Sequence, residues 1–227
     1  MLFSLLRGQL DFGTAVVQIL AILVIIFLIL PFHEWAHAFS ALKLGDTSIK
    51  YRGRLSLNPV SHIDPFGALC LLLFGFGWAK PVPVDARNFK NPKVGMAICA
   101  FAGPLANFVA ALAGALIFNA LLCFAPMIVL SQIGMYVIYF LQYYIAVNIS
   151  LAVFNLIPIP PLDGSKVLFA LLPDKIVYQI YQYERYFFII LYVLLFSGIL
   201  SRPLSILSNF LLQAVEFIAG LPFLPFS

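Results

Sequence analysis

Three ionisable side chains stand at the end of a long apolar run, and this placement constrains the fold more than any other feature of the sequence. The run extends from Ala15 to Phe32 and leads directly into His33-Glu34-Trp35-Ala36-His37. An apolar segment of this length is typical of a membrane-spanning helix. Ionisable side chains are costly within hydrocarbon and usually serve a function there. We therefore expect a metal site inside a membrane helix.

The composition of the whole chain indicates that this helix is one of several. Hydrophobic residues make up 63% of the 227 residues and charged residues 10%, whereas soluble domains contain about 25% charged residues. We predict an all-α polytopic membrane protein with about five transmembrane helices. They are expected at residues 15–44, 94–124, 133–157, 186–200 and 203–221.

The positive charges are distributed asymmetrically along the chain. Of the thirteen Lys and Arg residues, all except Arg7 and Arg202 fall within residues 43–93 and 166–185. Positive loops remain in the cytosol, so we predict a multi-pass protein of the cell membrane with its N-terminus outside and its main basic loop cytosolic. The charge is explained by this topology and by anionic lipid headgroups. Nucleic-acid binding is excluded, and the oligomeric state cannot be derived from the sequence.

The segment between the first two predicted helices has a different pattern. Residues 49–57 alternate apolar with polar or basic side chains, which predicts a strand with one wet face. Residues 66–79 are apolar but short and rich in glycine, which favours a re-entrant loop. Alternating prolines keep residues 80–84 extended. We therefore expect a small membrane-associated β-hairpin or re-entrant region here.

His33 and His37 can bind one metal ion together. Residues four apart lie on the same face of a helix, and two histidines with this spacing are typical zinc ligands. Glu34 lies close to that face and is placed to take a proton from water at the metal. The pattern is typical of a zinc hydrolase.

A catalytic zinc site needs a third protein ligand. The candidates are His62, Asp64, Asp163, Glu184 and Glu216. Asp163 is favoured because the prolines of residues 158–161 break a predicted helix at membrane depth, and such a break is tolerated only in protein or beside a wet cavity. The alternative is that Asp163 merely caps the helix that follows.

Two motifs together resemble a known family. His33-Glu34-x-x-His37, followed by Asn155-x-x-Pro158-x-x-Pro161-Leu162-Asp163-Gly164, is similar to the signature of the site-2 proteases, zinc metalloproteases that cut substrate proteins within the membrane. Gly103-Pro104-Leu105-Ala106-Asn107 and residues 77–84 extend the resemblance, which covers residues 15 to about 172.

The resemblance implies a role for each motif residue. His33, His37 and Asp163 would bind Zn²⁺, and Glu34 would activate the water. Asn155 would contact the substrate backbone or stabilise the developing oxyanion. The roles of Asn107, in the site or in helix–helix hydrogen bonding, and of His62, in the site or in a turn, stay open.

The family resemblance also predicts the organisation of the chain. Many members carry a further helix before the zinc-binding helix and a PDZ domain. This sequence has room for neither, which indicates the short, compact branch. We expect one membrane-embedded metalloprotease domain over residues 1–227, with a catalytic core at about 15–172 and C-terminal helices at about 183–221.

The expected function is hydrolysis of peptide bonds in transmembrane substrate proteins near the cytosolic side. The extended residues 81–84, or the predicted strand, would pair with an unwound substrate by β-augmentation. One alternative is a non-hydrolytic metal-binding or transport protein, or a pseudoprotease scaffold. A prenyl-protein endopeptidase shares only the first motif.

Overall fold

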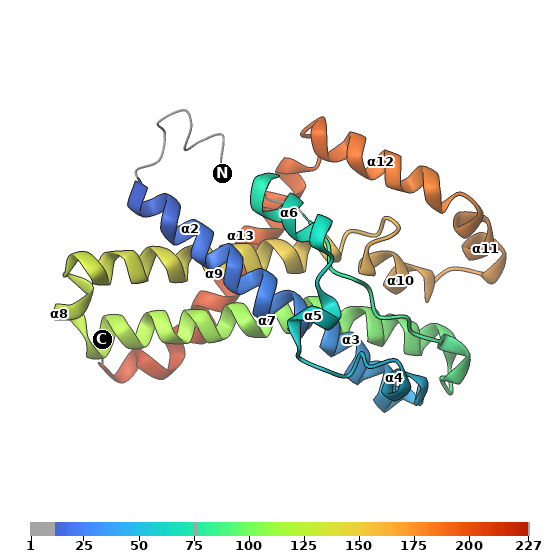
Figure 1. Cartoon of the computed structure of the whole chain (residues 1–227), viewed down its shortest axis with the longest axis horizontal. Helices are drawn as coiled ribbons and strands as arrows, with labels where there is room; N and C mark the ends of the chain where they lie inside the picture. The colour runs from blue at the N-terminus through green and yellow to red at the C-terminus, as the bar shows by residue number, and fades with distance from the viewer. Residues whose placement is uncertain (1–11, 75–76, 227) are drawn as a thin grey trace.

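The computed structural model describes residues 12–74 and 77–226. Figure 1 shows an assembly of helices joined by irregular segments. Arg7 and two residues of the predicted re-entrant loop lie outside the described residues. The elements are α2 (Phe12–Val24), a π-helical segment (Ile25–Ile29), α3 (Leu30–Leu44), α4 (Ser48–Tyr51), α5 (Pro59–His62), α6 (Pro65–Phe74), a 3-10 turn (Ala86–Asn88), α7 (Pro92–Phe124), α8 (Pro126–Val129), α9 (Gln132–Asn155), α10 (Asp163–Phe169), α11 (Asp174–Gln182), α12 (Glu184–Phe196), α13 (Ser201–Gly220) and a final 3-10 segment (Leu221–Phe226).

The first spanning helix runs without a break through α2, the π-helical segment and α3. The π segment ends at Ile29, two residues before Pro31. Proline lacks an N–H group and clashes with the carbonyl four residues earlier, and a wider π turn accommodates this locally. The helix ends at Gly45, which adopts a left-handed conformation with φ 119°.

Among the described residues, four helices are long and apolar enough to cross a bilayer: Phe12–Leu44, Pro92–Phe124, Gln132–Asn155 and Ser201–Pro225. The predicted fifth span, residues 186–200, corresponds to α12, which has only 13 residues. A helix of that length extends about 20 Å, less than the roughly 30 Å of a bilayer core. The prediction of five spans is therefore not confirmed.

The predicted strand at residues 49–57 is wrong. Within the described residues there is no strand, and the segment begins with the short helix α4. Residues 49 and 51 would lie on the same side of a strand, but Ile49 is fully buried while Tyr51 is 90% exposed. The alternation therefore does not define one buried face. The only pairing in this region is an isolated antiparallel bridge between Ile63 and Ala79. An isolated pair of strands has little stability of its own.

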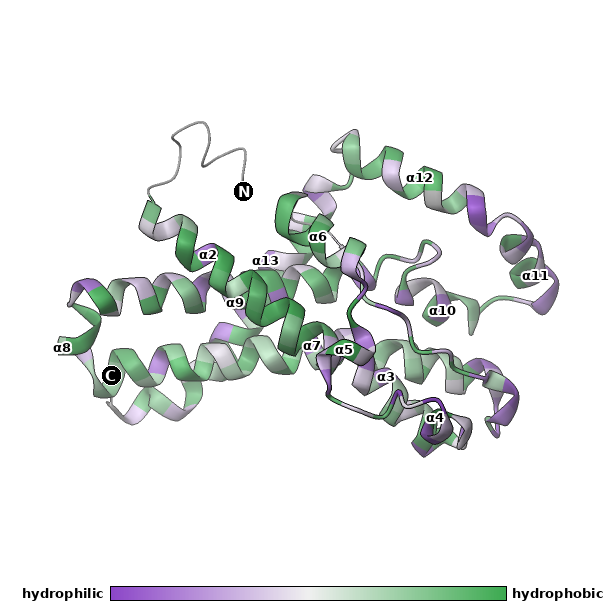
Figure 2. Ribbon diagram, in the orientation of Figure 1, coloured by the Kyte–Doolittle hydropathy of each residue, from purple (hydrophilic) through white to green (hydrophobic). Residues whose placement is uncertain are grey.

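The long helix α7 lies at the centre of the packing and contacts α3, α9, α10 and α13. Its covered face consists largely of small residues, including Gly103, Ala106, Ala110, Ala111 and Gly114. Small side chains allow helix backbones to approach closely in a membrane protein. Figure 2 shows that hydrophobic residues predominate along all the long helices.

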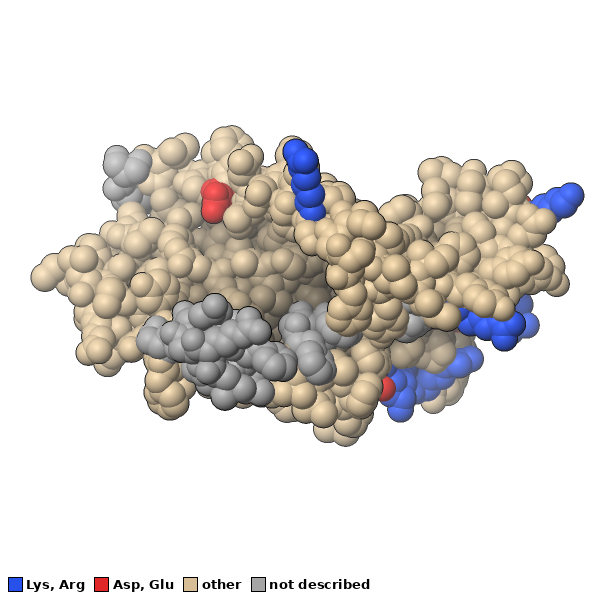
Figure 3. Space-filling view, turned by 90° about the horizontal axis from the view of Figure 1, so that it is seen from above, with Lys and Arg blue, Asp and Glu red and all other residues tan. Residues whose placement is uncertain are grey.

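The surface separates charged from uncharged regions. On the face drawn in Figure 3, Lys and Arg gather mainly at the end of the molecule that carries α4 and α11, while the opposite end is almost free of charge. Figure 2 shows many of the hydrophilic residues at the same end, although some lie elsewhere along the helices. This distribution is what a membrane protein with one basic side requires.

Candidate metal centre

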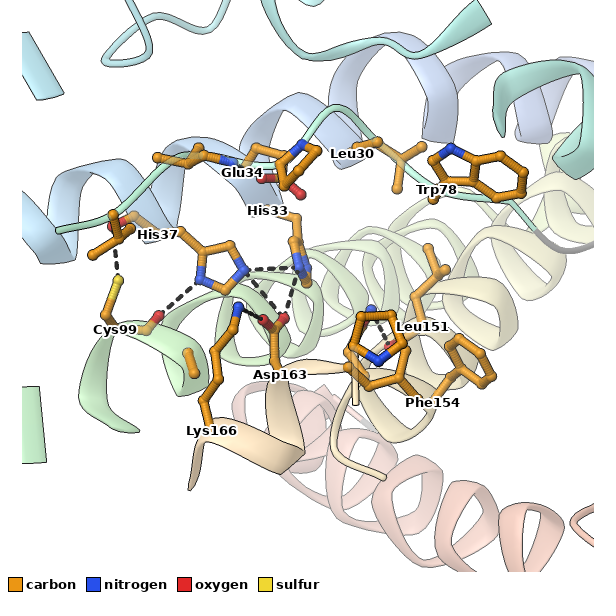
Figure 4. A pocket seen from close by; sticks show the side chains of 18 of the residues that line it. Leu30, His33, Glu34, His37, Trp78, Cys99, Leu151, Phe154, Asp163 and Lys166 are labelled. Carbon is orange, nitrogen blue, oxygen red and sulfur yellow. Dashed lines mark hydrogen bonds and ion pairs between the residues drawn. The ribbon is translucent and has the colours of Figure 1, made fainter. Parts of the chain in front are cut away.

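Three side chains that are distant in sequence converge in the structure. His33 and His37 lie one turn apart on α3, and Asp163 is the first residue of α10. The Oδ2 atom of Asp163 lies 3.3 Å from His33 Nε2 and 3.2 Å from His37 Nε2. The two Nε2 atoms are 3.1 Å apart. All three side chains are buried, and Figure 4 shows them pointing toward one another.

The broken end of α9 brings Asp163 to this position. The chain turns at residues 156–162 and enters α10, which packs on α7. Gly164 makes the turn possible, because a Cβ atom there would lie 2.2 Å from the carbonyl oxygen of Leu156. The N-cap of α10 is Leu162, and the side-chain contacts of Asp163 among the described residues are with the two histidines and Lys166. The capping alternative is not supported.

Neighbouring groups orient the three side chains. His37 Nδ1–H donates to the carbonyl of Cys99 at 2.7 Å, which leaves Nε2 without a proton and free to bind a metal. The Nζ atom of Lys166 lies 3.3 Å from Asp163 Oδ1, so only Oδ2 faces the histidines. Gly103 keeps the space beside them open, since a Cβ atom there would lie 2.4 Å from His37 Nε2.

The donor atoms fit zinc in number, chemistry and spacing. Two imidazole nitrogens and one carboxylate oxygen are ordinary zinc ligands, with bonds of about 2.0–2.2 Å. Ligand atoms on a tetrahedron of that size are about 3.3 Å apart, and the three observed separations are 3.1, 3.2 and 3.3 Å. Three protein ligands leave the fourth position to water or substrate, as in catalytic zinc sites.

Glu34 lies beside the three and takes a different partner. Its side chain is buried, and its Oε2 atom accepts a hydrogen bond from the backbone N–H of Val82 at 3.1 Å. It is therefore held next to the metal ligands by the extended chain that crosses α3 (Figure 4). A carboxylate in this position can act as a proton acceptor without being a ligand.

The three candidate ligands, Glu34 and Asn155 line one cavity of about 560 Å³. Asn155 ends α9, and its Nδ2 donates to the carbonyl of Leu151 at 3.0 Å. Asn155 is thus beside the cavity but apart from the ligand cluster. Further walls of the cavity come from Trp78, Val82 and Tyr192.

The other ligand candidates are not brought to the cluster. His62 is fully buried, and its Nε2 donates to the carbonyl of Ser56 at 2.6 Å, as expected of a turn residue. Asp64 accepts from the first backbone N–H groups of α6. Neither Glu184 nor Glu216 is among the cavity-lining residues. Asn107 is fully buried, and its amide atoms have no hydrogen-bond partner within the described residues, so the helix–helix hydrogen bond that was one of its two possible roles is not found there.

Three features of the site were missed by sequence reasoning. Two are backbone groups, the Cys99 carbonyl and the Val82 N–H, and no side-chain pattern reveals such groups. The third is Lys166, three residues after Asp163. This spacing places two residues of a helix side by side, so it was a usable signal.

Comparison with known proteins agrees with this geometry. Residues 124–198 match the model of Peptidase family M50. YwhC of Bacillus subtilis (strain 168), provisionally named a zinc metalloprotease, is 40% identical over 172 residues, which cover 75% of this chain and 78% of YwhC. Rip2 of Mycolicibacterium smegmatis, which carries the same provisional description, is 30% identical over 75% of this chain and 64% of its own length.

A more distant source gives the same result. MJ0611 of Methanocaldococcus jannaschii, also provisionally named a zinc metalloprotease, is 33% identical over 60% of this chain and 63% of its own length. No solved structure matches the chain significantly. The ligand set fits zinc, and each relative bears the name of a zinc enzyme. The chain therefore belongs to peptidase family M50, the site-2 protease family of zinc metalloproteases.

Proposed function

We propose that this membrane zinc metalloprotease is an intramembrane endopeptidase that hydrolyses peptide bonds in transmembrane substrate proteins near the cytosolic side. The observation that carries the proposal is the triangle of His33, His37 and Asp163 with Glu34 on the wall of the same cavity. A metal-storage or scaffold protein needs the triangle but has no use for Glu34. The family assignment makes the protein a hydrolase and excludes the transport alternative.

In this proposal His33, His37 and Asp163 hold the zinc ion. A zinc ion bound there supplies Lewis acidity toward water and toward a peptide carbonyl. Glu34 accepts the proton that the attacking water loses at its carboxylate and returns it to the nitrogen of the leaving amine. Lys166 holds Asp163 Oδ1 away from the ligand cluster.

Asn155 is proposed to contact the backbone of the substrate. Its Nδ2 is engaged with Leu151 in the structure, so the amide must either exchange that partner or use its carbonyl oxygen. A side-chain amide facing the reacting carbonyl can stabilise the charge that develops on its oxygen.

The depth of the site supports a membrane-embedded substrate. His37 lies seven residues from Leu44, the end of α3, or about 10 Å at 1.5 Å per residue. The basic end of the molecule is proposed to face the cytosol, with the N-terminus outside and the chain in the cell membrane. The whole of residues 1–227 is proposed to form one membrane-embedded domain.

A transmembrane helix must unwind before its carbonyls can be attacked, and the extended chain at Lys80–Val84 is the proposed site of pairing. Pro81 and Pro83 have no N–H groups. The remaining three donors are occupied: Lys80 N–H by His62, Val82 N–H by Glu34 and Val84 N–H by the Val82 carbonyl. The segment therefore offers carbonyl oxygens, and the substrate must supply the N–H groups.

The test compares Glu34→Gln with wild type in proteoliposomes that contain a labelled single-pass transmembrane peptide. We expect zinc content to stay stoichiometric while cleavage falls by about 10²–10⁴-fold, the usual contribution of a general base. Glu216→Gln is the matched control, because Glu216 is exposed on α13 and absent from the cavity. An active Glu34→Gln enzyme, or an inactive Glu216→Gln enzyme with full zinc, would contradict the assignment.

A further inference from the structure

The extended segment Lys80–Val84, here called the strap, crosses the zinc-binding helix and touches it at Glu34. Val82 N–H donates to Glu34 Oε2 at 3.1 Å. An extended segment has no internal ladder to hold its shape, because prolines at positions 81 and 83 remove two of its donors. The position of Val82 must therefore be fixed from the two ends of the strap.

The first end of the strap is held by His62. Lys80 N–H donates to the His62 carbonyl at 2.7 Å, next to the bridge between Ile63 and Ala79. The His62 ring is itself bonded to the Ser56 carbonyl. This end is therefore tied to the irregular chain before α6.

The second end is held by Asp46, whose side chain is fully buried. Asp46 Oδ2 accepts from the backbone N–H of Asp85 at 2.8 Å, directly after the strap. Asp46 Oδ1 accepts from Asn88 Nδ2 at 2.9 Å and from the Ser48 hydroxyl at 2.6 Å. One carboxylate thus accepts hydrogen bonds both from the residues that follow the strap and from Ser48, which follows α3.

Asp46 is tied directly to the end of α3, the helix that carries Glu34. Asp46 follows Gly45, the left-handed residue that ends α3, and its own N–H donates to the Ala41 carbonyl at 2.9 Å. The close approach also depends on Gly45, because a Cβ atom there would lie 2.7 Å from the carbonyl oxygen of Asn88. The strap is therefore anchored on the helix that carries the base it contacts.

Asp46 remains a carboxylate in this setting. Burial alone would raise its pKa, but hydrogen bonds from Ser48, Asp85 and Asn88 outweigh burial and hold the pKa below its ordinary value. The exposed Arg87 pairs with the partly buried Asp85 side chain instead. A buried charge is poor evidence for a stabilising role, so a positional role for Asp46 explains its burial better.

We propose that Asp46 is a positioning residue for catalysis: by anchoring the end of the strap on α3, it sets Val82 N–H against the Glu34 carboxylate. The inference rests on the proposed role of Glu34 as base. Without the anchor, Val82 N–H no longer holds the Glu34 carboxylate in one orientation. The rate of turnover then falls, while zinc binding is unchanged.

The test uses the full-length protein in detergent micelles, with the labelled single-pass transmembrane peptide as the cleavage probe. Asp46→Asn keeps an oxygen for Ser48 and Asn88 but turns an NH₂ group toward the Asp85 N–H. We expect kcat to fall about tenfold, equivalent to ~1.4 kcal/mol, with KM and zinc content unchanged. Hydrogen exchange should accelerate in peptides that contain the strap and stay unchanged in α7. Asp174→Asn, which alters an exposed partner of Lys93, is the matched control and should resemble wild type in all four measurements.

A second variant separates positioning from simple loosening. Val82→Pro removes the N–H that Glu34 accepts and suits an already extended, proline-flanked segment. If Asp46 acts through that N–H, Asp46→Asn lowers kcat in wild type but adds nothing in the Val82→Pro background, as a double-mutant cycle measures directly. Multiplying effects, or an unchanged strap exchange rate in Asp46→Asn, would overturn the proposal. If neither the wild type nor any variant cleaves the probe, the proposed function is contradicted. If Asp46→Asn still accelerates hydrogen exchange in the strap, the role of Asp46 as its anchor is retained.

Discussion

The cavity has two walls that are similarly apolar in sequence but packed very differently. On the α3 side, His33, Glu34 and His37 are buried, and α3 and α10 both contact the central helix α7. On the α12 side, Leu191 is the only buried residue among the described side chains. α12 makes only sparse contacts with the other described elements and lies at the edge of the molecule in Figure 1. The ligand positions are therefore fixed by many contacts, whereas the distance of α12 from them is fixed by few.

The largest effect is expected when a proposed zinc ligand is removed from the closely packed wall. Asp163→Ala deletes the oxygen that lies 3.2 Å from His37 Nε2, and two histidines alone make a poor zinc site. We expect zinc affinity to fall by more than about 100-fold, beyond the usual effect of an outer-shell change, with loss of all cleavage. Metal analysis of the purified protein checks this, and stoichiometric zinc in the variant would move the third ligand elsewhere.

A substitution at Gly103 tests how closely the packed wall surrounds the two histidine rings. Gly103→Ala places a Cβ atom 2.4 Å from His37 Nε2 and 2.5 Å from His33 Nε2, so the rings must move. We expect zinc affinity to fall by about 10–100-fold, as for other changes that reorient a ligand. Competition with a chelator measures it. Gly220→Ala is the control, since no atom lies within 4 Å of the added group, and equal zinc affinity of the two variants would contradict tight packing at Gly103.

The loosely packed wall should respond differently. Leu191→Ala truncates the one side chain of α12 that is buried among its described residues, which we expect to cost about 2 kcal/mol locally, the low end for a buried leucine. Hydrogen exchange in α12 should accelerate while zinc content stays unchanged. Ile189→Ala, at a side chain that is 61% exposed, should leave both unchanged. Zinc loss in Leu191→Ala would show that the two walls are coupled.

The smallest expected effect is the contribution of Asp46, which anchors the strap, to the loss of thermal stability at low pH. The pKa of Asp46 is lowered in the folded protein, so its contribution to stability is complete above the unfolded value of about 3.9 and is lost as pH falls through the folded value. Wild type should therefore lose more thermal stability than Asp46→Asn when pH is lowered from 5 to about 3. Circular dichroism melts measure the difference, and parallel curves would refute the linkage.

The sequence predicts which site residues lie close together where their spacing along one helix determines the distance between them. The four-residue spacing of His33 and His37 placed both rings on one face of α3. The proline-rich segment drew attention to Asp163, which the structure brings beside the two rings. The strand at residues 49–57 was wrong because a period of two cannot show whether a partner strand exists. The fifth span is not confirmed, since α12 has only 13 residues and ends at Phe196. The Asp46 anchor could not be predicted, because it joins a side chain to a backbone N–H group 39 residues later in the chain, beyond α4, α5 and α6.

The central claim is that two imidazole nitrogens of α3 and one carboxylate oxygen of α10 hold a zinc ion. X-ray absorption at the zinc edge of the purified wild-type protein tests it most directly. The account predicts a first shell of nitrogen and oxygen alone at about 2.0–2.2 Å, with the outer scattering of two imidazoles and no sulfur. A sulfur neighbour at about 2.3 Å, which would implicate a thiolate such as that of Cys99, or the signal of fewer than two imidazoles, would contradict it.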